Sequence, residues 1–177
     1  LRPSVVYSVD DNFTTNFMTL LNRLPLFPLY YFGKTKFMPI HCEDLTDVIY
    51  HIISNNIDSK IIECVGPEEM SLKEILERLL LLINKKRFLL PFPLFLAKLS
   101  AKIFQLFPDP LLTEDQLKLL KYDNVLSGKY KTNADIGSPS KRFFDFEVKK
   151  YAYMWKEGGQ FSTEKYISNN DLENKAN

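Results

Sequence analysis

The stretch that decides the fold is Leu1-Arg-Pro-Ser-Val-Val-Tyr7, an apolar run in which the only charged residue is the second one. Its β-branched and aromatic residues predict a short buried strand over residues 1–6. Pro3 has no N–H to give to a ladder, so we expect it near the end of the strand or at a sheet edge. The next polar residues, Asp10-Asp-Asn12, are typical of a helix start and predict a helix over 13–24.

A buried parallel strand needs neighbouring strands, and no residue precedes position 1 to supply one. We therefore expect the chain to be the back end of a larger α/β protein, whose first partner is a missing N-terminal half of the same fold. The 177 residues allow one domain, or one and a fraction, and 45% of hydrophobic residues is enough for a core. The bias toward Lys, Asn, Ile and Phe, with only 6 Gly, indicates a bacterial source.

The overall charge argues against nucleic acid as a partner. The net charge is +1, and no basic stripe with interleaved aromatic residues is present. The one basic triplet, Lys85-Lys-Arg87, is explained by a solvated helix end. Cys42 and Cys64 are too few for a disulfide framework and are expected to be reduced, buried residues of an intracellular protein. No apolar run reaches the ~18 residues that a membrane-spanning helix needs.

Short strands and helices alternate along the rest of the chain. Strands are predicted over 35–40 and 60–65, and the proline-containing stretch 25–31 is predicted to be a loop. Asp44 is predicted to be the N-cap of a helix that runs to about Ser54.

The strongest helix signal is Ser71-Leu-Lys-Glu74, a capping box that opens an amphipathic helix over 72–84. Further helices are predicted over 91–107, from Thr113 and over 142–155, with a loop over 123–140. The order of these predicted strands and helices indicates an α/β fold. It has three parts: the end of a sheet with interleaved helices (1–65), a helical C-terminal lobe for a substrate or partner (66–157) and a disordered tail (158–177).

Several stretches, in this order and spacing, resemble the extended short-chain dehydrogenase/reductases. Within them, the pattern is similar to the atypical subfamily that contains accessory subunit 9 of respiratory complex I, the NADH:ubiquinone oxidoreductase. The resemblance covers roughly residues 1–137. It is carried by Leu1-Arg-Pro-Ser-Val-Val-Tyr7, Lys34-Thr-Lys-Phe-Met-Pro-Ile-His-Cys-Glu-Asp44, Glu63-Cys-Val-Gly-Pro67, Leu90-Pro-Phe-Pro-Leu-Phe95, Phe107-Pro108 and Leu112-Thr-Glu-Asp-Gln116.

The resemblance implies the C-terminal part of a Rossmann-type NAD(P)-binding fold. It places Pro3, Ser4 and Val5 at the nicotinamide-facing end of a late strand, where their backbone groups and the Ser4 hydroxyl can meet the carboxamide. The alternative is an ordinary buried strand. The implied cofactor is NADP or NAD, held mostly by the missing N-terminal half.

Two features of the family are missing from the expected places. No Gly-x-x-Gly-x-x-Gly follows a strand, and no predicted helix carries the Tyr-x-x-x-Lys pair that must lie on one helical face. We therefore expect this chain alone to have no hydride-transfer activity. The implied role is support of the assembly or stability of NADH:quinone oxidoreductase. The alternatives are a free-standing NAD(P)-dependent epimerase, dehydratase or reductase on a nucleotide-sugar-like or other carbonyl substrate, and a helical interaction domain without a ligand.

Two further stretches leave alternatives open. His41-Cys-Glu-Asp44 contains four side chains that can ligate metal, but a strand end followed by a helix cap explains it better. The segment from Pro93 to Phe107 has a broad apolar face with Lys98 and Lys102, which suits either a core helix or a helix that meets complex I subunits or the membrane surface. The expected location is the cytoplasm, including the cytoplasmic face of the inner membrane, or the mitochondrial matrix if the source is eukaryotic.

Overall fold

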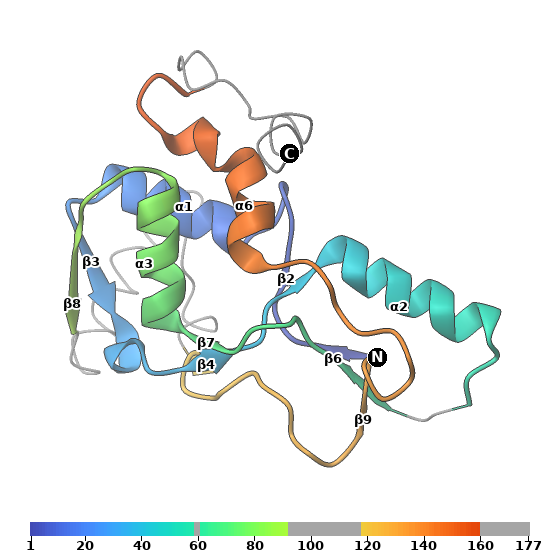
Figure 1. Ribbon diagram of the computed structural model, residues 1–177. Helices are drawn as coiled ribbons and strands as arrows, with labels where there is room; N and C mark the ends of the chain where they lie inside the picture. Colours follow the sequence, from blue (N-terminus) through green and yellow to red (C-terminus); the bar gives the residue numbers. More distant parts are fainter. Residues whose placement is uncertain (59–60, 92–117, 160–177) are drawn as a thin grey trace, which may run out of the picture.

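The computed structural model describes residues 1–58, 61–91 and 118–159. Over these residues the chain is a mixed α/β protein with short, mostly parallel strands, which confirms the predicted α/β class (Figure 1). The helices predicted over 91–107 and from Thr113, and nearly all of the predicted tail, lie outside the described residues.

The helices agree with the amphipathic patterns in the sequence. They are α1 (Thr14–Arg23), α2 (Cys42–Ser54), α3 (Leu72–Leu82) and α6 (Phe144–Ala152), with 3-10 turns η1 (Tyr30–Gly33) and η2 (Tyr153–Trp155). The start of α1 has the chemistry expected for it, because the Asp11 carboxylate accepts hydrogen bonds from the N–H groups of Phe13 and Thr15. The predicted capping box of α3 is confirmed.

The strands are short, and most of them pair in parallel. They are β1 (Arg2–Pro3), β2 (Val6–Tyr7), β3 (Leu26–Leu29), β4 (Lys36–Phe37), β5 (Ile40–His41), β6 (Ile62–Cys64), β7 (Met70–Ser71), β8 (Phe88–Pro91) and β9 (Lys131–Thr132). The order β1-β6-β9 forms a parallel sheet, β2 pairs in parallel with β5, and β3 pairs in parallel with β8. Only β4 and β7 are antiparallel among the described pairs.

The opening stretch differs from the single buried strand predicted over residues 1–6. It is split into β1, which pairs with β6, and β2, which pairs with β5. Leu1 is 52% exposed, whereas Tyr7 is fully buried. The strand changes partner at Ser4 and Val5: the Ser4 N–H bonds to Cys64 O (2.9 Å), and the Ile40 N–H bonds to Val5 O (2.9 Å).

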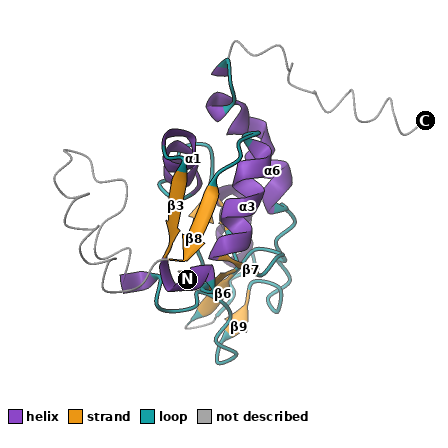
Figure 2. Cartoon of the chain, turned by 90° about the vertical axis from the view of Figure 1, so that its left-hand side faces the viewer, coloured by secondary structure: helices purple, strands orange, loops and turns teal. Residues whose placement is uncertain are grey.

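A second correction concerns the stretch 25–31, which was predicted to be a loop. It contains β3, in which Pro28 lies opposite Leu90 of β8. A proline is tolerated there because, among the described residues, β3 has a partner on one side only, so its missing N–H breaks no second ladder. Figure 2 shows β3 and β8 lying side by side, next to α3.

Two hydrophobic clusters hold the elements together. The larger one joins α1, α3 and α6 with the buried side of β3, and its fully buried members include Met18, Leu21, Ile75 and Leu79. The smaller one lies between α2 and the parallel strands. It has four buried members: Ile40, Val48, Ile62 and Cys64. The larger cluster contains residues from both sides of position 65, where the sequence predicts a domain boundary. The buried members of the smaller cluster all precede that position, and the partly buried Ile136 packs against them from beyond it.

Gly66 is required where β6 leaves the sheet. Its N–H bonds to Met38 O (3.1 Å), and a Cβ added at this position would lie 1.7 Å from Pro39 O. Only glycine allows the two backbones to come this close. Gly66 therefore keeps the end of β6 against the segment that leads into β5.

Candidate functional site

The predicted cofactor-facing residues lie where the opening strand changes partner. Pro3 is exposed and lies opposite Cys64 in the ladder, Ser4 is buried, and Val5 is half-buried. The Ser4 hydroxyl donates to Asn124 O (2.9 Å) and accepts from the Met38 N–H (3.3 Å). Ser4 therefore ties three segments together, and its side chain is already occupied within the protein.

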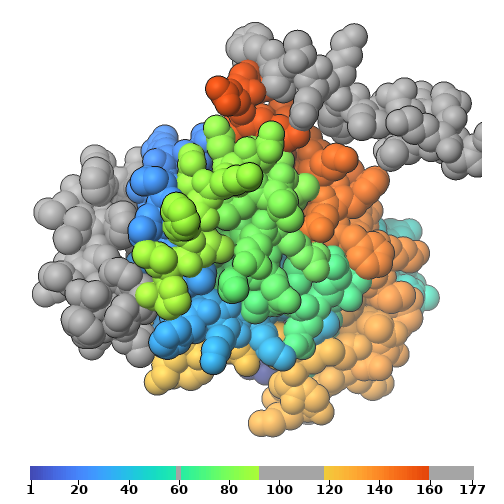
Figure 3. Space-filling model, turned by 60° about the vertical axis from the view of Figure 1, so that its left-hand side comes forward, coloured from blue at the N-terminus to red at the C-terminus, as the bar shows by residue number. Residues whose placement is uncertain are grey.

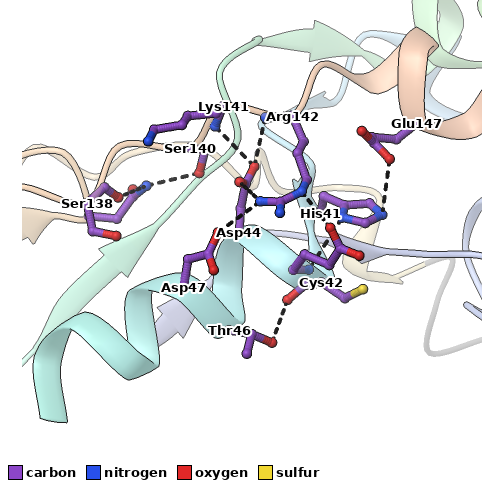
Figure 4. A network of polar contacts seen from close by, with 12 residues as sticks. His41, Cys42, Asp44, Thr46, Asp47, Ser138, Ser140, Lys141, Arg142 and Glu147 are labelled. Carbon is purple, nitrogen blue, oxygen red and sulfur yellow. Dashed lines mark hydrogen bonds and ion pairs between the residues drawn. The ribbon is translucent and has the colours of Figure 1, made fainter. Parts of the chain in front are cut away.

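A polar cluster lies nearby, at the carboxyl ends of β2 and β5, where parallel strands of α/β proteins present ligands. Figure 4 shows its centre, Asp44, at the start of α2. Asp44 was predicted to be an N-cap, and that prediction is wrong, because α2 begins two residues earlier, at Cys42. The cap is His41, whose ring Nδ1 accepts from the Glu43 N–H (3.3 Å).

The Asp44 carboxylate instead binds a loop that lies 97 and 98 residues further along the chain. One oxygen accepts the N–H groups of Lys141 (3.2 Å) and Arg142 (3.0 Å), and the other accepts Nη1 of Arg142 (2.6 Å). The same guanidinium meets Asp47 (2.9 Å) and Glu43 (2.7 Å), so it lies among three carboxylates (Figure 4). The side chain of Asp44 is only 3% exposed.

The charges around Arg142 determine its protonation. Partial burial alone would lower the pKa of the guanidinium. The hydrogen bonds to Asp47 and Asp44, together with the charges of Asp44 and Glu43, have a larger effect. They hold this pKa above its usual value. Arg142 is therefore a permanent cation that joins the loop before α6 to the first turn of α2.

The second half of the cluster is formed by Tyr7, His41 and Glu147. The Tyr7 and His41 rings meet edge to face with centroids 5.2 Å apart, and His41 Nε2 lies 3.9 Å from Glu147 Oε2. Glu147 is buried on α6 and also pairs with Lys150 (2.6 Å). Burial, and then the Glu147 carboxylate, raises the pKa of the Tyr7 phenol, so Tyr7 stays protonated. Because Nδ1 of His41 accepts a hydrogen bond, Nε2 carries the proton when the ring is neutral.

A third polar chain connects α6 with α1. The Tyr151 phenol lies 2.8 Å from Thr14 Oγ1, which also bonds to the Asp11 carboxylate (2.6 Å). Burial raises the pKa of Tyr151, although the hydrogen bond with Thr14 opposes the rise. Within the described residues, every buried side-chain nitrogen or oxygen atom has a partner, and no group of three or more His, Cys, Asp or Glu residues is arranged to hold a metal ion.

The Tyr-x-x-x-Lys spacing occurs once, in Tyr30-Tyr-Phe-Gly-Lys34, outside any helix predicted from the sequence. The structure places it in η1, where Tyr31 and Phe32 have positive φ angles of 51° and 60°. Tyr30 and Lys34 therefore do not lie one α-helical turn apart. Tyr30 is also 1% exposed and belongs to the larger hydrophobic cluster.

Sequence reasoning missed Arg142, Glu147 and Asn133. Asn133 is buried; its side chain accepts the Val65 N–H (3.1 Å) and donates to Val65 O (3.3 Å), beyond the end of β6. None of the three lies in a local motif. Asn133 binds Val65, Arg142 binds Asp44 and Glu147 contacts His41, and these partners are 68, 98 and 106 positions away. Only the fold brings them together.

No family model matches the chain, and no curated protein matches it. The fold and the cluster therefore define a mixed α/β protein in which polar side chains join the carboxyl ends of two parallel strands to α6.

Proposed function

We propose that this chain is the C-terminal part of an NAD(P)-binding, atypical short-chain dehydrogenase/reductase similar to the complex I accessory subunit. Its role would be to support the assembly or stability of NADH:quinone oxidoreductase. The single observation that carries the proposal is the unfinished parallel sheet at β1. The order β1-β6-β9 leaves one side of β1 without a partner among the described residues. Parallel strands are almost always flanked and covered on both faces.

The surface of α2 supports the same proposal. Only Asp44 and Val48 are fully buried on this 13-residue helix, whereas five residues are buried on the 11-residue α3. Leu45 and Ile52 are partly buried against the smaller cluster, and Ile49 and Ile53 are exposed. These apolar residues recur at helical spacing. An N-terminal half that added strands beside β1 would also cover this stripe of α2.

The proposed cofactor site follows from the same geometry. Pro3 lies at the carboxyl end of β1, which is the end of a parallel strand where α/β proteins bind ligands. Pro3 is exposed, and Ser4 and Val5 are fixed by hydrogen bonds to three other segments. These residues would form a rigid wall beside the nicotinamide of NADP or NAD, using backbone groups rather than the Ser4 hydroxyl. The missing half would hold the pyrophosphate.

A structural role fits the polar cluster better than catalysis does. The phenols of Tyr7 and Tyr151 are buried, and burial raises both pKa values, so neither phenol is prepared to exchange a proton near neutral pH. Asp44 accepts the backbone N–H groups of residues 141 and 142, and His41 accepts the Glu43 N–H at the start of α2. One observation favours the alternative of a free-standing enzyme: His41 contacts Glu147 at the strand ends.

The test uses NADPH fluorescence. The 177-residue chain alone should not bind NADPH tightly, and the same chain joined to its N-terminal half should bind it. A dissociation constant in the low micromolar range for the chain alone, which corresponds to ~8 kcal/mol, would overturn the proposal.

Assembly of the two halves gives a second readout. Replacing Ile49 and Ile53 by Lys should abolish assembly while leaving the melting temperature of the chain almost unchanged, because both side chains are already exposed. Ser54→Lys, at the exposed end of the same helix, is the matched control and should assemble normally. Turnover of a carbonyl substrate by the assembled protein, lost in His41→Gln, would favour the free-standing enzyme.

A further inference from the structure

Four segments meet at the end of the molecule where α1 and α3 terminate. Arg87 donates from Nε to Leu21 O (2.9 Å) and from Nη2 to Asn22 O (3.1 Å), which fixes it to the last turn of α1. The Phe88 N–H bonds to Pro25 O (3.3 Å), so β3 and β8 start side by side there. We call this surface the cationic end. It consists of Arg23, Leu26, Leu81, Lys85, Lys86, Arg87, Phe88 and Leu90.

The charge of this surface has one sign. The sequence contains no Asp or Glu over residues 13–42 or over residues 78–91, so the cationic end has four basic side chains and no acid of its own. The nearest acid on α3, Glu77, is paired with Lys73 (3.6 Å). The C-terminal ends of the two helices contribute roughly one negative charge together, which leaves a clear positive excess.

A solvated helix end explains only part of this composition. Arg87 alone binds the free carbonyl groups of α1, whereas Arg23 and Lys86 are exposed. A solvated end also gives no reason for the apolar residues that share the surface. Leu81 is 80% exposed and Phe88 is 75% exposed.

The exposed apolar residues form one face. Leu26 lies opposite Phe88 in the ladder, and Leu90 follows Phe88 by two residues, so all three point away from the core, in the opposite direction to Phe27. In Figure 3 the yellow-green atoms of β8 lie at the surface of the molecule, beside the blue atoms of α1. The exposed side chains of Leu26, Phe88 and Leu90 are therefore apolar, and three basic residues, Lys85, Lys86 and Arg87, directly precede Phe88 in the chain.

We propose that the cationic end docks on the surface of a bilayer that contains anionic phospholipids. Phe88 and Leu81 would enter the headgroup region, while the long stems of Lys85, Lys86 and Arg23 extend their charges to the phosphates. None of the helices in the described part of the chain is long and apolar enough to cross a membrane. Exposed apolar side chains that share a surface with four basic residues favour a lipid surface over an acidic protein. The inference does not depend on the proposed function.

Vesicle flotation of the 177-residue chain without nucleotide tests the proposal. The chain should float with vesicles of phosphatidylcholine mixed equally with phosphatidylglycerol and stay behind with phosphatidylcholine alone. Replacing Lys85 and Lys86 by Gln should weaken binding by about 30-fold, because each basic residue near an anionic surface contributes about 1 kcal/mol. Phe88→Gln with Leu81→Gln should also weaken binding, and the loss should persist at high salt.

Matched controls come from other exposed positions. Lys129→Gln with Lys131→Gln removes two exposed cations near β9, and Tyr50→Gln removes an aromatic side chain that is 73% exposed on α2. Both controls should bind vesicles like the unchanged chain. The proposal is overturned if the unchanged chain does not float with anionic vesicles, or if the controls weaken binding as much as the test variants. It is also overturned if the cationic end binds an acidic protein but not the vesicles.

Discussion

The helices α2 and α3 carry an acidic residue at the same position, the third of the helix, and use it in opposite ways. Glu74 of α3 turns back to its own N-cap, where it accepts the Ser71 N–H (2.6 Å) and hydroxyl (2.8 Å). Asp44 of α2 turns away from its helix and accepts two N–H groups and a guanidinium from the loop at 141–142. Glu74 is exposed, whereas Asp44 is buried.

This difference separates local from long-range stabilisation. The capping box of α3 satisfies the start of one helix and needs no other part of the chain. The Asp44 contacts instead fix α6 against α2, because Arg142 lies two residues before α6 begins. The N-cap of α2 is His41, whose side chain accepts from the Glu43 N–H. The position within a helix therefore does not decide what an acid does; burial and the available partner decide it.

The largest effect should follow removal of the buried acid. Asp44→Ala should lower the free energy of unfolding by about 3 kcal/mol, because it leaves Arg142 and two N–H groups without their acceptor. Asp44→Asn keeps one acceptor oxygen and should cost about 2 kcal/mol. Urea midpoints at constant m-value measure both. Asp47→Ala is the control, since Asp47 is an exposed partner of the same guanidinium and should cost below about 1 kcal/mol. Equal costs for Asp44→Ala and Asp47→Ala would contradict the comparison.

A smaller loss is expected from the basic partner. Arg142→Ala should cost about 2 kcal/mol, since Asp44 keeps the backbone N–H groups of residues 141 and 142. A double-mutant cycle with Asp44→Asn should give a coupling energy of about 1 kcal/mol, because the two side chains touch. A coupling near zero would mean that the backbone N–H groups alone hold the loop. Lys141→Ala, which keeps its backbone N–H, should not couple with Asp44→Asn.

The two helices also explain what could be predicted from the sequence. Ser71 and Glu74 are three residues apart, so their pairing is visible in a short window, and it was predicted correctly. Asp44 looks like an N-cap in the same kind of window, but its partner is 98 positions away. The helix pattern of α3 is likewise local, whereas the strand at 26–29 exists only because β8 lies beside it, so Pro28 misled the prediction.

The candidate site shows the same limit. The sequence singles out Pro3, Ser4 and Val5 through a resemblance, and the structure fixes where they lie, at the change of partner between β6 and β5. The sequence does not single out Glu147 or Arg142. A carboxylate that becomes buried and a guanidinium that becomes held by three acids look like ordinary surface charges in a sequence. Such residues become visible only when burial is known.

The next smaller effect concerns the N-cap of α3. Ser71→Ala removes the side-chain acceptor of the Glu74 N–H (3.2 Å) and should cost about 1 kcal/mol. Ser71→Thr keeps the hydroxyl and is the matched control, with a much smaller cost. Amide exchange should show that the loss is confined to the first turn of α3 and leaves α2 and α6 unchanged. Faster exchange in α6 would show that the cap is not local.

The smallest effect is a dependence on pH. Hydrogen bonds from the Ser71 N–H, and then from its hydroxyl, hold the pKa of Glu74 below its ordinary value. A carboxylate whose pKa is lower in the folded state stabilises the fold above its unfolded pKa and loses that contribution as the pH falls through its folded pKa.

Glu74→Gln should therefore cost about 0.5 kcal/mol at neutral pH, a small value because Glu74 is exposed and screened by solvent. The gap between the two proteins should close as the solution is acidified through the usual range of glutamate and below it. Melting temperatures of both proteins across this range measure the effect, with Glu77→Gln as the control for the loss of an exposed acid on the same helix. A gap that stays constant down to acid pH would mean that the Glu74 charge contributes nothing to the capping box. The advantage of Glu74 over Gln would then come from contacts that do not depend on its charge.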